Sequence, residues 1–130
     1  MAFLSYSVFQ TQSATDANAP STQGVVNPSG TVYSVPWTGR HSDGYGLTVF
    51  TTGTLTGTFT LWATDKQSPS TADDSDWVQD TSFSPTNPAG AAVKFRDDTN
   101  TFKALHKRLK YVHSSGSGTI TGWVNVPRTA

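Results

Sequence analysis

The sequence contains no cysteine and no glutamate. The absence of cysteine excludes disulfide bonds and thiolate ligands to a metal ion. Nine basic residues balance nine acidic ones, so the net charge gives no reason to expect nucleic acid or an anionic membrane as a partner. The chain has no apolar run of the roughly 18–20 residues that a membrane span needs, and no signal-peptide pattern. We therefore expect a soluble protein that is not exported through a cleaved signal.

The composition favours strands over helices. Leucine is sparse, threonine and serine are abundant, and aromatic residues make up 12% of the 130 residues. Beta-branched and aromatic side chains suit a pleated sheet, and large rings fill a thin core between two sheets. A chain of this length corresponds to one domain.

Two stretches follow the same plan. Residues 45–64 run from an alternating strand through a Gly- and Thr-rich turn into a second strand that places Phe59 and Leu61 on one face. Residues 108–126 repeat this order, with the turn SSGSG between two alternating runs. We predict a β-hairpin at each place. With seven or eight strands along the chain, the sequence predicts an all-β protein, a single-domain antiparallel β-sandwich of jelly-roll type.

The beginning of the chain differs from the rest. Residues 1–9 have apolar residues at both parities, which is typical of a strand covered on both faces or of an arm lying on a neighbouring subunit. A long stretch without periodicity follows. We predict an extended N-terminal arm and tether over 1–30 and a β-sandwich domain over 31–130. The arm residues expected at a protein interface are Phe3, Leu4, Tyr6, Val8 and Phe9.

One short helix of one or two turns is predicted within residues 97–109, with Asn100 as its N-cap, and from Arg108 onward the chain alternates as a strand. Phe102, Leu105 and Leu109 have the spacing of one helical face.

No pattern of catalytic or metal-binding residues stands out. His41, His106 and His113 do not have the spacing of a metal site. His41, Ser42 and Asp43 are sequence neighbours, whereas the members of a catalytic triad converge from separate elements. We therefore expect no enzymatic activity, no metal and no cofactor.

Charges of opposite sign are segregated along the chain. Residues 65–80 carry five Asp and one Lys, and residues 94–110 carry six basic residues and two Asp. The acidic stretch is either a solvated loop or a calcium site, although it lacks the ligand order of an EF-hand. The two stretches form an ordinary solvated surface, pair within one subunit or meet across subunits, and contact across subunits is our prediction. The basic residues could also hold nucleic acid, but the chain lacks the net positive charge of a dedicated binder. The residues assigned to these contacts are Asp73, Asp74, Asp76, Lys103, Lys107, Arg108 and Lys110.

Three tryptophans are candidates for a surface role. Trp62 and Trp123 have the opposite parity to the inward-facing residues of their strands, and Trp37 shares its parity with Tyr33 and Val35. Exposed large aromatics mark interaction sites, either as anchors against another protein or as platforms for sugar rings. The alternative is that a loop or the N-terminal segment covers them.

Taken together, these motifs resemble a known family. The strand GLTVF, the segment TGTLTGTFTLWAT, an acidic loop closing on Trp77, the strand AVKF and the ending RLKYVHSSGSGTITGWVNV resemble small all-β virion structural proteins of tailed bacteriophages, over roughly residues 45–126. The DDSD and FKALHK stretches depart from that pattern.

The resemblance implies a head decoration, or cement, protein. Such a protein forms a homotrimer, binds the major capsid protein at the capsid surface of the virion, and is made in the host cytoplasm. It has no enzymatic activity and binds neither nucleic acid nor membrane. The alternatives are a carbohydrate- or receptor-binding module of a tail fibre and a tail or neck joining protein.

Overall fold

The described residues form ten strands and one short 3-10 turn. The computed structural model of the chain describes residues 2–7, 25–26, 28, 30–38, 45–80, 94–99 and 104–128. The elements are β1 (Ala2–Ser7), β2 (Val25–Val26), β3 (Thr31–Tyr33), β4 (Trp37–Thr38), β5 (Tyr45–Thr51), β6 (Thr56–Thr64), η1 (Asp74–Asp76), β7 (Val78–Asp80), β8 (Lys94–Thr99), β9 (His106–Ser115) and β10 (Thr119–Arg128). The predicted all-β class is confirmed.

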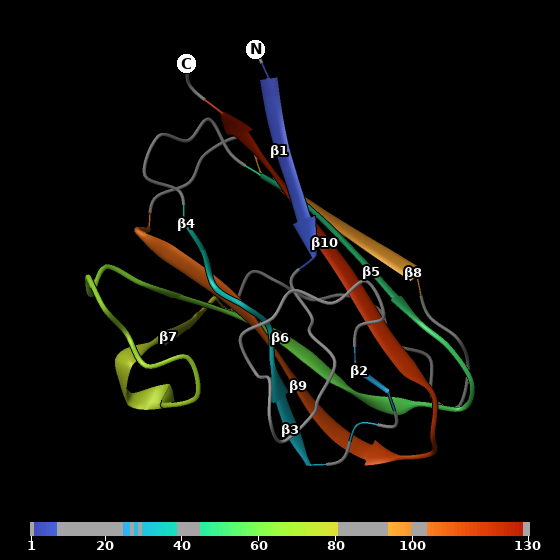
Figure 1. The fold of residues 1–130 in the computed structure, drawn as a ribbon. Helices are drawn as coiled ribbons and strands as arrows, with labels where there is room; N and C mark the ends of the chain where they lie inside the picture. Colours follow the sequence, from blue (N-terminus) through green and yellow to red (C-terminus); the bar gives the residue numbers. More distant parts are fainter. Residues whose placement is uncertain are drawn as a thin grey trace.

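The strands form two antiparallel sheets of five strands each. In the first sheet the order is β1-β10-β5-β8, and β2 also pairs with β10. In the second sheet the order is β3-β9-β6-β7, and β4 also pairs with β9. Figure 1 shows the two sheets as layers, with β5 and β10 in one and β6 and β9 in the other.

The two sheets are connected strand by strand at their centres, so that corresponding positions hold consecutive segments of the chain. The chain passes from β5 in the first sheet to β6 in the second, and from β9 in the second to β10 in the first. Because β5 pairs with β10 and β6 pairs with β9, these two segments run side by side through both sheets. In the first sheet β8 lies beside β5 and β1 lies beside β10. In the second sheet β7 lies beside β6 and β3 lies beside β9.

The two predicted hairpins are therefore wrong. The strands on either side of each glycine turn belong to opposite sheets and do not pair with each other. A glycine turn reverses the chain but does not determine which sheet receives the second strand. Alternating apolar residues suit either outcome, because both strands face the same core. Each of the segments 45–64 and 106–128 therefore crosses from one sheet to the other, with one strand on each side of the core.

The two glycine turns pack against each other. The backbone amides of Thr52 and Thr54 donate to the carbonyls of Thr119 and Ser117, at 3.0 and 2.9 Å. Gly53 and Gly116 have φ values of 72° and 81°. These values lie in the left-handed region, which glycine occupies without steric cost.

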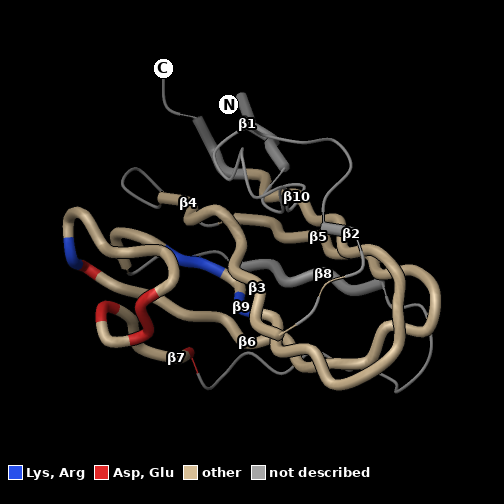
Figure 2. Tube along the Cα trace, turned by 60° about the horizontal axis from the view of Figure 1, so that its bottom comes forward, with Lys and Arg blue, Asp and Glu red and all other residues tan. Residues whose placement is uncertain are grey.

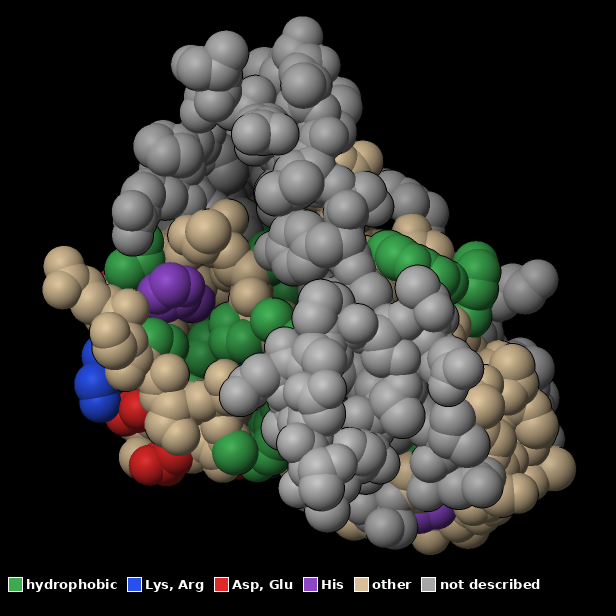
Figure 3. All heavy atoms as spheres, viewed as in Figure 1, with side chains coloured by type: hydrophobic (Ala, Val, Ile, Leu, Met, Phe, Trp, Pro, Cys, Tyr) green, Lys and Arg blue, Asp and Glu red, His purple; other side chains and the backbone are tan. Residues whose placement is uncertain are grey.

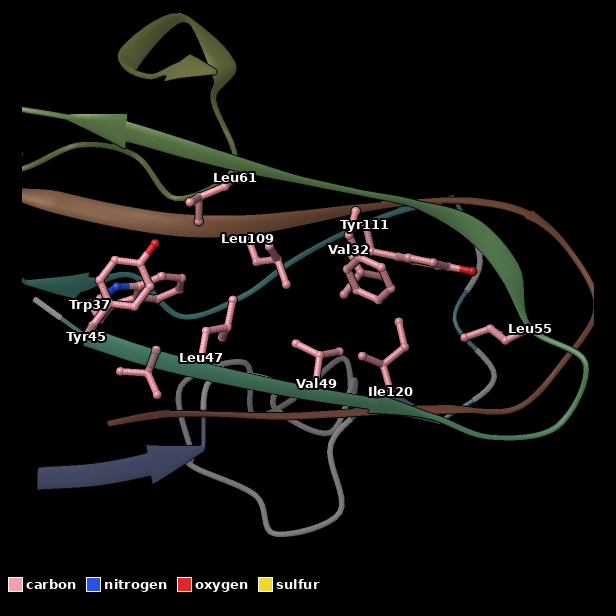
Figure 4. Packing of buried hydrophobic residues seen from close by; sticks show 12 residues of the cluster. Val32, Trp37, Tyr45, Leu47, Val49, Leu55, Leu61, Leu109, Tyr111 and Ile120 are labelled. Atoms are coloured by element: carbon pink, nitrogen blue, oxygen red, sulfur yellow. The ribbon is translucent and has the colours of Figure 1, made fainter. Parts of the chain in front are cut away.

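The core lies between the sheets and is built from their inward-facing residues. Figure 4 shows Leu47, Val49 and Ile120 from the first sheet facing Leu61 and Leu109 from the second. All five are buried. Burial of one such side chain stabilises the fold by about 1.5–3 kcal/mol. The alternation read from the sequence in β5, β6 and β10 is confirmed for these strands.

The predicted helix over 97–109 is wrong in its described part. Residues up to Thr99 belong to β8, and His106 begins β9. Leu109 lies in the core as a strand residue and pairs with Leu61. The spacing of Leu105 and Leu109 fits a helix, but tertiary pairing with β6 overrides a weak local preference. Asn100 and Phe102 lie outside the described residues.

Candidate functional site

The outer face of the second sheet carries a cluster of rings and charges around Arg108. Strand register places Arg108 opposite Trp62 and places Lys110 opposite Tyr33. The Arg108 guanidinium lies 4.5 Å from the centroid of the Tyr33 ring, 4.8 Å from that of Trp77 and 5.4 Å from that of Trp62. A planar guanidinium stacks well on aromatic faces. Three rings therefore hold one cation on the outside of a sheet.

Arg108 is fully buried although it points away from the core. One terminal nitrogen donates to the carbonyl of Thr71 at 2.6 Å, and the other donates to a carboxylate oxygen of Asp74 at 2.5 Å. The second Asp74 oxygen accepts from Lys110 at 2.5 Å. Among the described residues, the Nε of Arg108 has no hydrogen-bond partner. A buried charge needs a partner of opposite sign, and Asp74 supplies it.

The segment 65–77 supplies this partner because it folds back over the sheet. Asp73 caps the turn η1 by accepting from the amide of Ser75, and the Trp77 indole donates to the carbonyl of Ser70 at 2.8 Å. Asp76 accepts from the Ser70 amide and from Lys66. Figure 2 shows the acidic residues of this segment in red, close to the basic residues of β9 in blue.

The ion pairs shift the acidity of two carboxyl groups. The hydrogen bond from Lys110 lowers the pKa of Asp74 below its ordinary value of 3.8, and Arg108 contributes in the same direction. The hydrogen bond from Lys66 lowers the pKa of Asp76. Both carboxylates are therefore charged well into the acidic range, and the cations of β9 are neutralised within the chain. This face is closed by its own loop and does not offer Arg108 to an anionic ligand.

The outer face of the first sheet has an aromatic pair that reaches solvent. The rings of Phe50 and Trp123 meet edge to face, with centroids 5.4 Å apart and planes at 71°. The exposed fraction is 37% for Phe50 and 36% for Trp123. These two residues, called the Phe50–Trp123 pair from here on, come from the neighbouring strands β5 and β10. Exposed rings of this size are typical of interaction surfaces.

The three predicted tryptophans have three different environments. Trp123 is exposed, as its parity indicated, and Trp62 is half-buried beside the Arg108 guanidinium. Trp37 is 1% exposed and packs edge to face on Tyr45 in the core, so its predicted surface role is wrong. The reason is local: residues 34–36 are not strand, so the alternation that gave Trp37 its parity is interrupted.

The predicted charged residues meet within one chain. Asp74 pairs with Arg108 and Lys110, and Lys107 lies 3.6 Å from Asp80. The prediction that Arg108 makes contacts across subunits is wrong, because its side chain is sealed beneath the segment 65–77. Asp73 and Asp76 serve the local structure of that segment. Figure 3 shows the visible charged side chains gathered at the left edge of the molecule in this view. Lys103 lies outside the described residues.

The predicted arm begins as a strand of the same chain. Ala2–Ser7 pairs with β10 over its whole length, with Leu4 opposite Val126 and Tyr6 opposite Val124. Phe3 belongs to the same strand, opposite Pro127. The further arm residues of the prediction, Val8 and Phe9, lie outside the described residues.

The described residues offer no metal site: no three His, Cys, Asp or Glu side chains among them converge. The Asp-rich stretch proposed as a calcium alternative directs Asp74 and Asp76 at lysine and arginine instead. His41, Ser42 and Asp43 are not among the described residues. Within the described part of the chain, no helix is both long and apolar enough to cross a lipid bilayer.

Two important residues were not singled out from the sequence. Phe50 was recognised as facing away from the core, but its contact with Trp123 depends on β5 pairing with β10. Tyr33 joins the Arg108 cluster because β3 pairs with β9. In each case the sequence indicates which face of its strand the residue lies on, but it does not indicate which strand lies beside it.

Comparisons with known proteins assign no family to this chain. No protein-family model, no curated protein and no solved structure matches it. What the chain does is therefore inferred from its own surfaces and contacts.

Proposed function

We propose that this chain is a non-enzymatic structural protein of a virion, and specifically a decoration, or cement, protein on the head of a tailed bacteriophage. The observation that carries the proposal is the Phe50–Trp123 pair, which leaves two large rings exposed on a sheet face. The resemblance of residues 45–126 to small phage structural proteins suggests that this surface binds within a virion. Exposed aromatic rings on a stable fold suit a protein whose function is to bind other proteins through its surface.

The contrast between the two outer faces supports this choice of surface. On the second sheet, Trp77 is buried, Trp62 is half-buried, both rings lie beside the Arg108 guanidinium, and Asp74 of the segment 65–77 neutralises that cation. On the first sheet, Phe50 and Trp123 keep more than a third of their surface in solvent. A chain that shields one set of rings and presents another has a natural binding face on the first sheet.

The proposal includes a finer description of the fold, a β-sandwich of jelly-roll type. Its support is the path of the chain, in which the paired segments β5–β6 and β10–β9 run together through both sheets around one core. Paired ribbons that wrap a core in this way are typical of jelly rolls.

In the proposed setting the protein is a homotrimer that binds the major capsid protein at the surface of the head. Aromatic anchors supply a large share of the binding free energy at protein interfaces. Repetition of a modest contact by symmetry gives strong overall attachment without a strong single contact.

Co-sedimentation with purified particles tests the proposal. The wild-type chain is expected to bind particles that lack it, and Trp123→Ala and Phe50→Ala are expected to reduce the bound copies at least about tenfold, since loss of one anchor costs 2 kcal/mol or more. Val112→Ala is the matched control, because Val112 is 43% exposed on the outer face of the second sheet. Equal loss in all three variants, or no binding by the wild type, contradicts the proposal.

A second candidate is a carbohydrate- or receptor-binding module of a tail fibre. The exposed indole of Trp123 favours it, because a flat ring stacks on the apolar face of a sugar. A glycan array probed with wild type and Trp123→Ala separates the two functions. Specific glycan binding that is lost in the variant supports the module. A tail or neck joining protein differs in location, which labelling of intact particles reveals.

A further inference from the structure

Among the described strands, β1 pairs with one neighbour. It lies at the edge of the first sheet, and its partner in that sheet is β10, over the register from Ala2 opposite Arg128 to Ser7 opposite Trp123. Figure 1 shows β1 lying along β10. Within the described part of the chain, β1 makes most of its contacts with β10. Within the described part of the chain, this backbone ladder is what fixes the register of β1.

The rest of the first sheet is organised without β1. On its other side, β10 pairs with β5 from Ile120 to Asn125, and Ile120 and Val124 are fully buried in the core between the sheets. Displacement of β1 exposes the edge of β10 from Trp123 to Arg128. An open edge presents unpaired amide and carbonyl groups, which is a ready template for another strand.

Chain connectivity does not force β1 onto its own β10. Residues 8–24, seventeen in number, separate β1 from β2. At roughly 3.3–3.6 Å per residue, such a length spans at most about 60 Å. The six residues of β1 are about 20 Å long at ~3.4 Å per residue. The connection is thus long enough for β1 to reach the β10 edge of an adjacent copy.

We propose that the edge of β10 is a docking site for the segment Ala2–Ser7 of a second copy of this chain, so that copies are joined by strand exchange. This inference deepens the proposed function and rests on it, because it names the partner at the first sheet. The backbone hydrogen bonds are the same in the closed and exchanged forms, so exchange costs little.

The Phe50–Trp123 pair lies where the two copies meet. Ser7, the last residue of the strand, is opposite Trp123, so an incoming strand enters beside the indole. Further contact between the copies begins at these rings, which are exposed in the single chain. The exposed pair and the exchangeable strand therefore form one continuous surface.

The absence of cysteine makes a direct test possible. Ser5 is opposite Asn125, and opposed residues of an antiparallel pair have Cα atoms about 4.5–5.5 Å apart, which a disulfide spans. A Ser5→Cys chain and an Asn125→Cys chain are unfolded together, refolded at increasing concentration and oxidised. The expected product is a heterodimer linked from position 5 to position 125, found by non-reducing gel and mass spectrometry, with a yield that rises with concentration.

Two controls make the outcome decisive. Thr121→Cys replaces Asn125→Cys in a mismatched mixture, because Thr121 is opposite Phe50 and has no partner residue in β1. The matched heterodimer is expected to exceed the mismatched one at least about tenfold. The double variant Ser5→Cys/Asn125→Cys reports on the register within one chain.

Two results overturn the proposal. If the double variant forms its internal disulfide while the mixture gives no heterodimer, β1 stays on its own chain. If the double variant gives no disulfide either, the β1–β10 ladder itself is wrong. Neither result decides the proposed function, which depends on particle binding by the wild type and Trp123→Ala.

Discussion

Asp74 and Arg108, thirty-four residues apart in the sequence, form an ion pair of 2.5 Å between a surface segment and the middle of a sheet. The guanidinium is completely buried, whereas 38% of the Asp74 side chain remains exposed. This pair connects the segment 65–77 to β9. It also explains how an arginine on the outer face of a strand is kept from solvent.

Replacement of Asp74 by asparagine is expected to destabilise the fold. The change removes the negative charge that neutralises Arg108 and Lys110, and leaves a buried cation without its counter-ion. We expect a loss of about 1.5–3 kcal/mol in the free energy of unfolding, as for a hydrogen bond to a charged group. The value stays below the 3–5 kcal/mol of a fully buried pair because Asp74 is partly solvated. Urea unfolding measures it.

Lys66→Ala is the matched control for Asp74→Asn. It breaks the ion pair with Asp76, but Lys66 is 57% exposed, and exposed pairs contribute about 0–1 kcal/mol. Equal losses in the two variants would show that burial of Arg108 does not govern the effect.

Acid is expected to weaken the attachment of the segment 65–77. The pKa of Asp74 is lower in the folded chain than its ordinary value of 3.8, because Lys110 donates a hydrogen bond to it. The unfolded chain therefore binds more protons as the pH falls, and folding loses stability below the unfolded pKa. The melting temperature of the wild type should fall more steeply between about pH 5 and pH 2 than that of Asp74→Asn. Parallel curves would contradict this.

Alanine at Gly116 is expected to be poorly tolerated. Gly116 has a φ of 81°, which costs another residue about 1–2 kcal/mol, and a Cβ there would overlap the carbonyl of Thr54 in the facing turn. Gly30→Ala is the control, since Gly30 has a φ of 67° but nothing within 4 Å of an added Cβ. We expect the larger loss of stability for Gly116→Ala in thermal unfolding. A larger loss for Gly30→Ala would show that the two turns do not pack closely.

Trp37→Ala and Trp123→Ala are expected to differ sharply in stability. Trp37 is 1% exposed and fills the core beside Tyr45, so its truncation should cost about 3–5 kcal/mol. Trp123 is 36% exposed, and its truncation should cost about 1 kcal/mol, the centre of the range for substitutions in general. Chemical unfolding of both variants measures the difference. A comparable cost for Trp123 would place that ring in the core and weaken the proposed function.

The sequence was sufficient to predict the core strands and their inward-facing residues, but not which strands pair with each other. Phe59 and Leu61 alternate without interruption, and local alternation determines which residues of a strand face the core. Which strand pairs with which depends on contacts far apart in the chain, such as that of Val49 with Gly122. The hairpin prediction failed for that reason. The helix prediction failed in its described part because β9 begins at His106 and pairs there with β6, which outweighed a short helical spacing.

The candidate sites were predictable to a similar extent. Charge segregation between residues 65–80 and 94–110 was visible, and the two stretches do meet. That they meet within one chain follows from the return of the segment after β6, which no local pattern specifies. Trp123 was identified by parity, whereas Trp37 was misplaced because residues 34–36 interrupt the strand. Parity therefore succeeds along an unbroken strand and fails across an irregular one.

The placement of β10 between β1 and β5 affects how the protein forms during synthesis. This strand is translated after every other described strand, yet it occupies an interior position of its sheet. While the ribosome is still producing it, β1 has no partner for its ladder and one edge of β5 is unpaired. Nascent chains held at that point should bind chaperones and stick to one another, and release of the finished chain should end both.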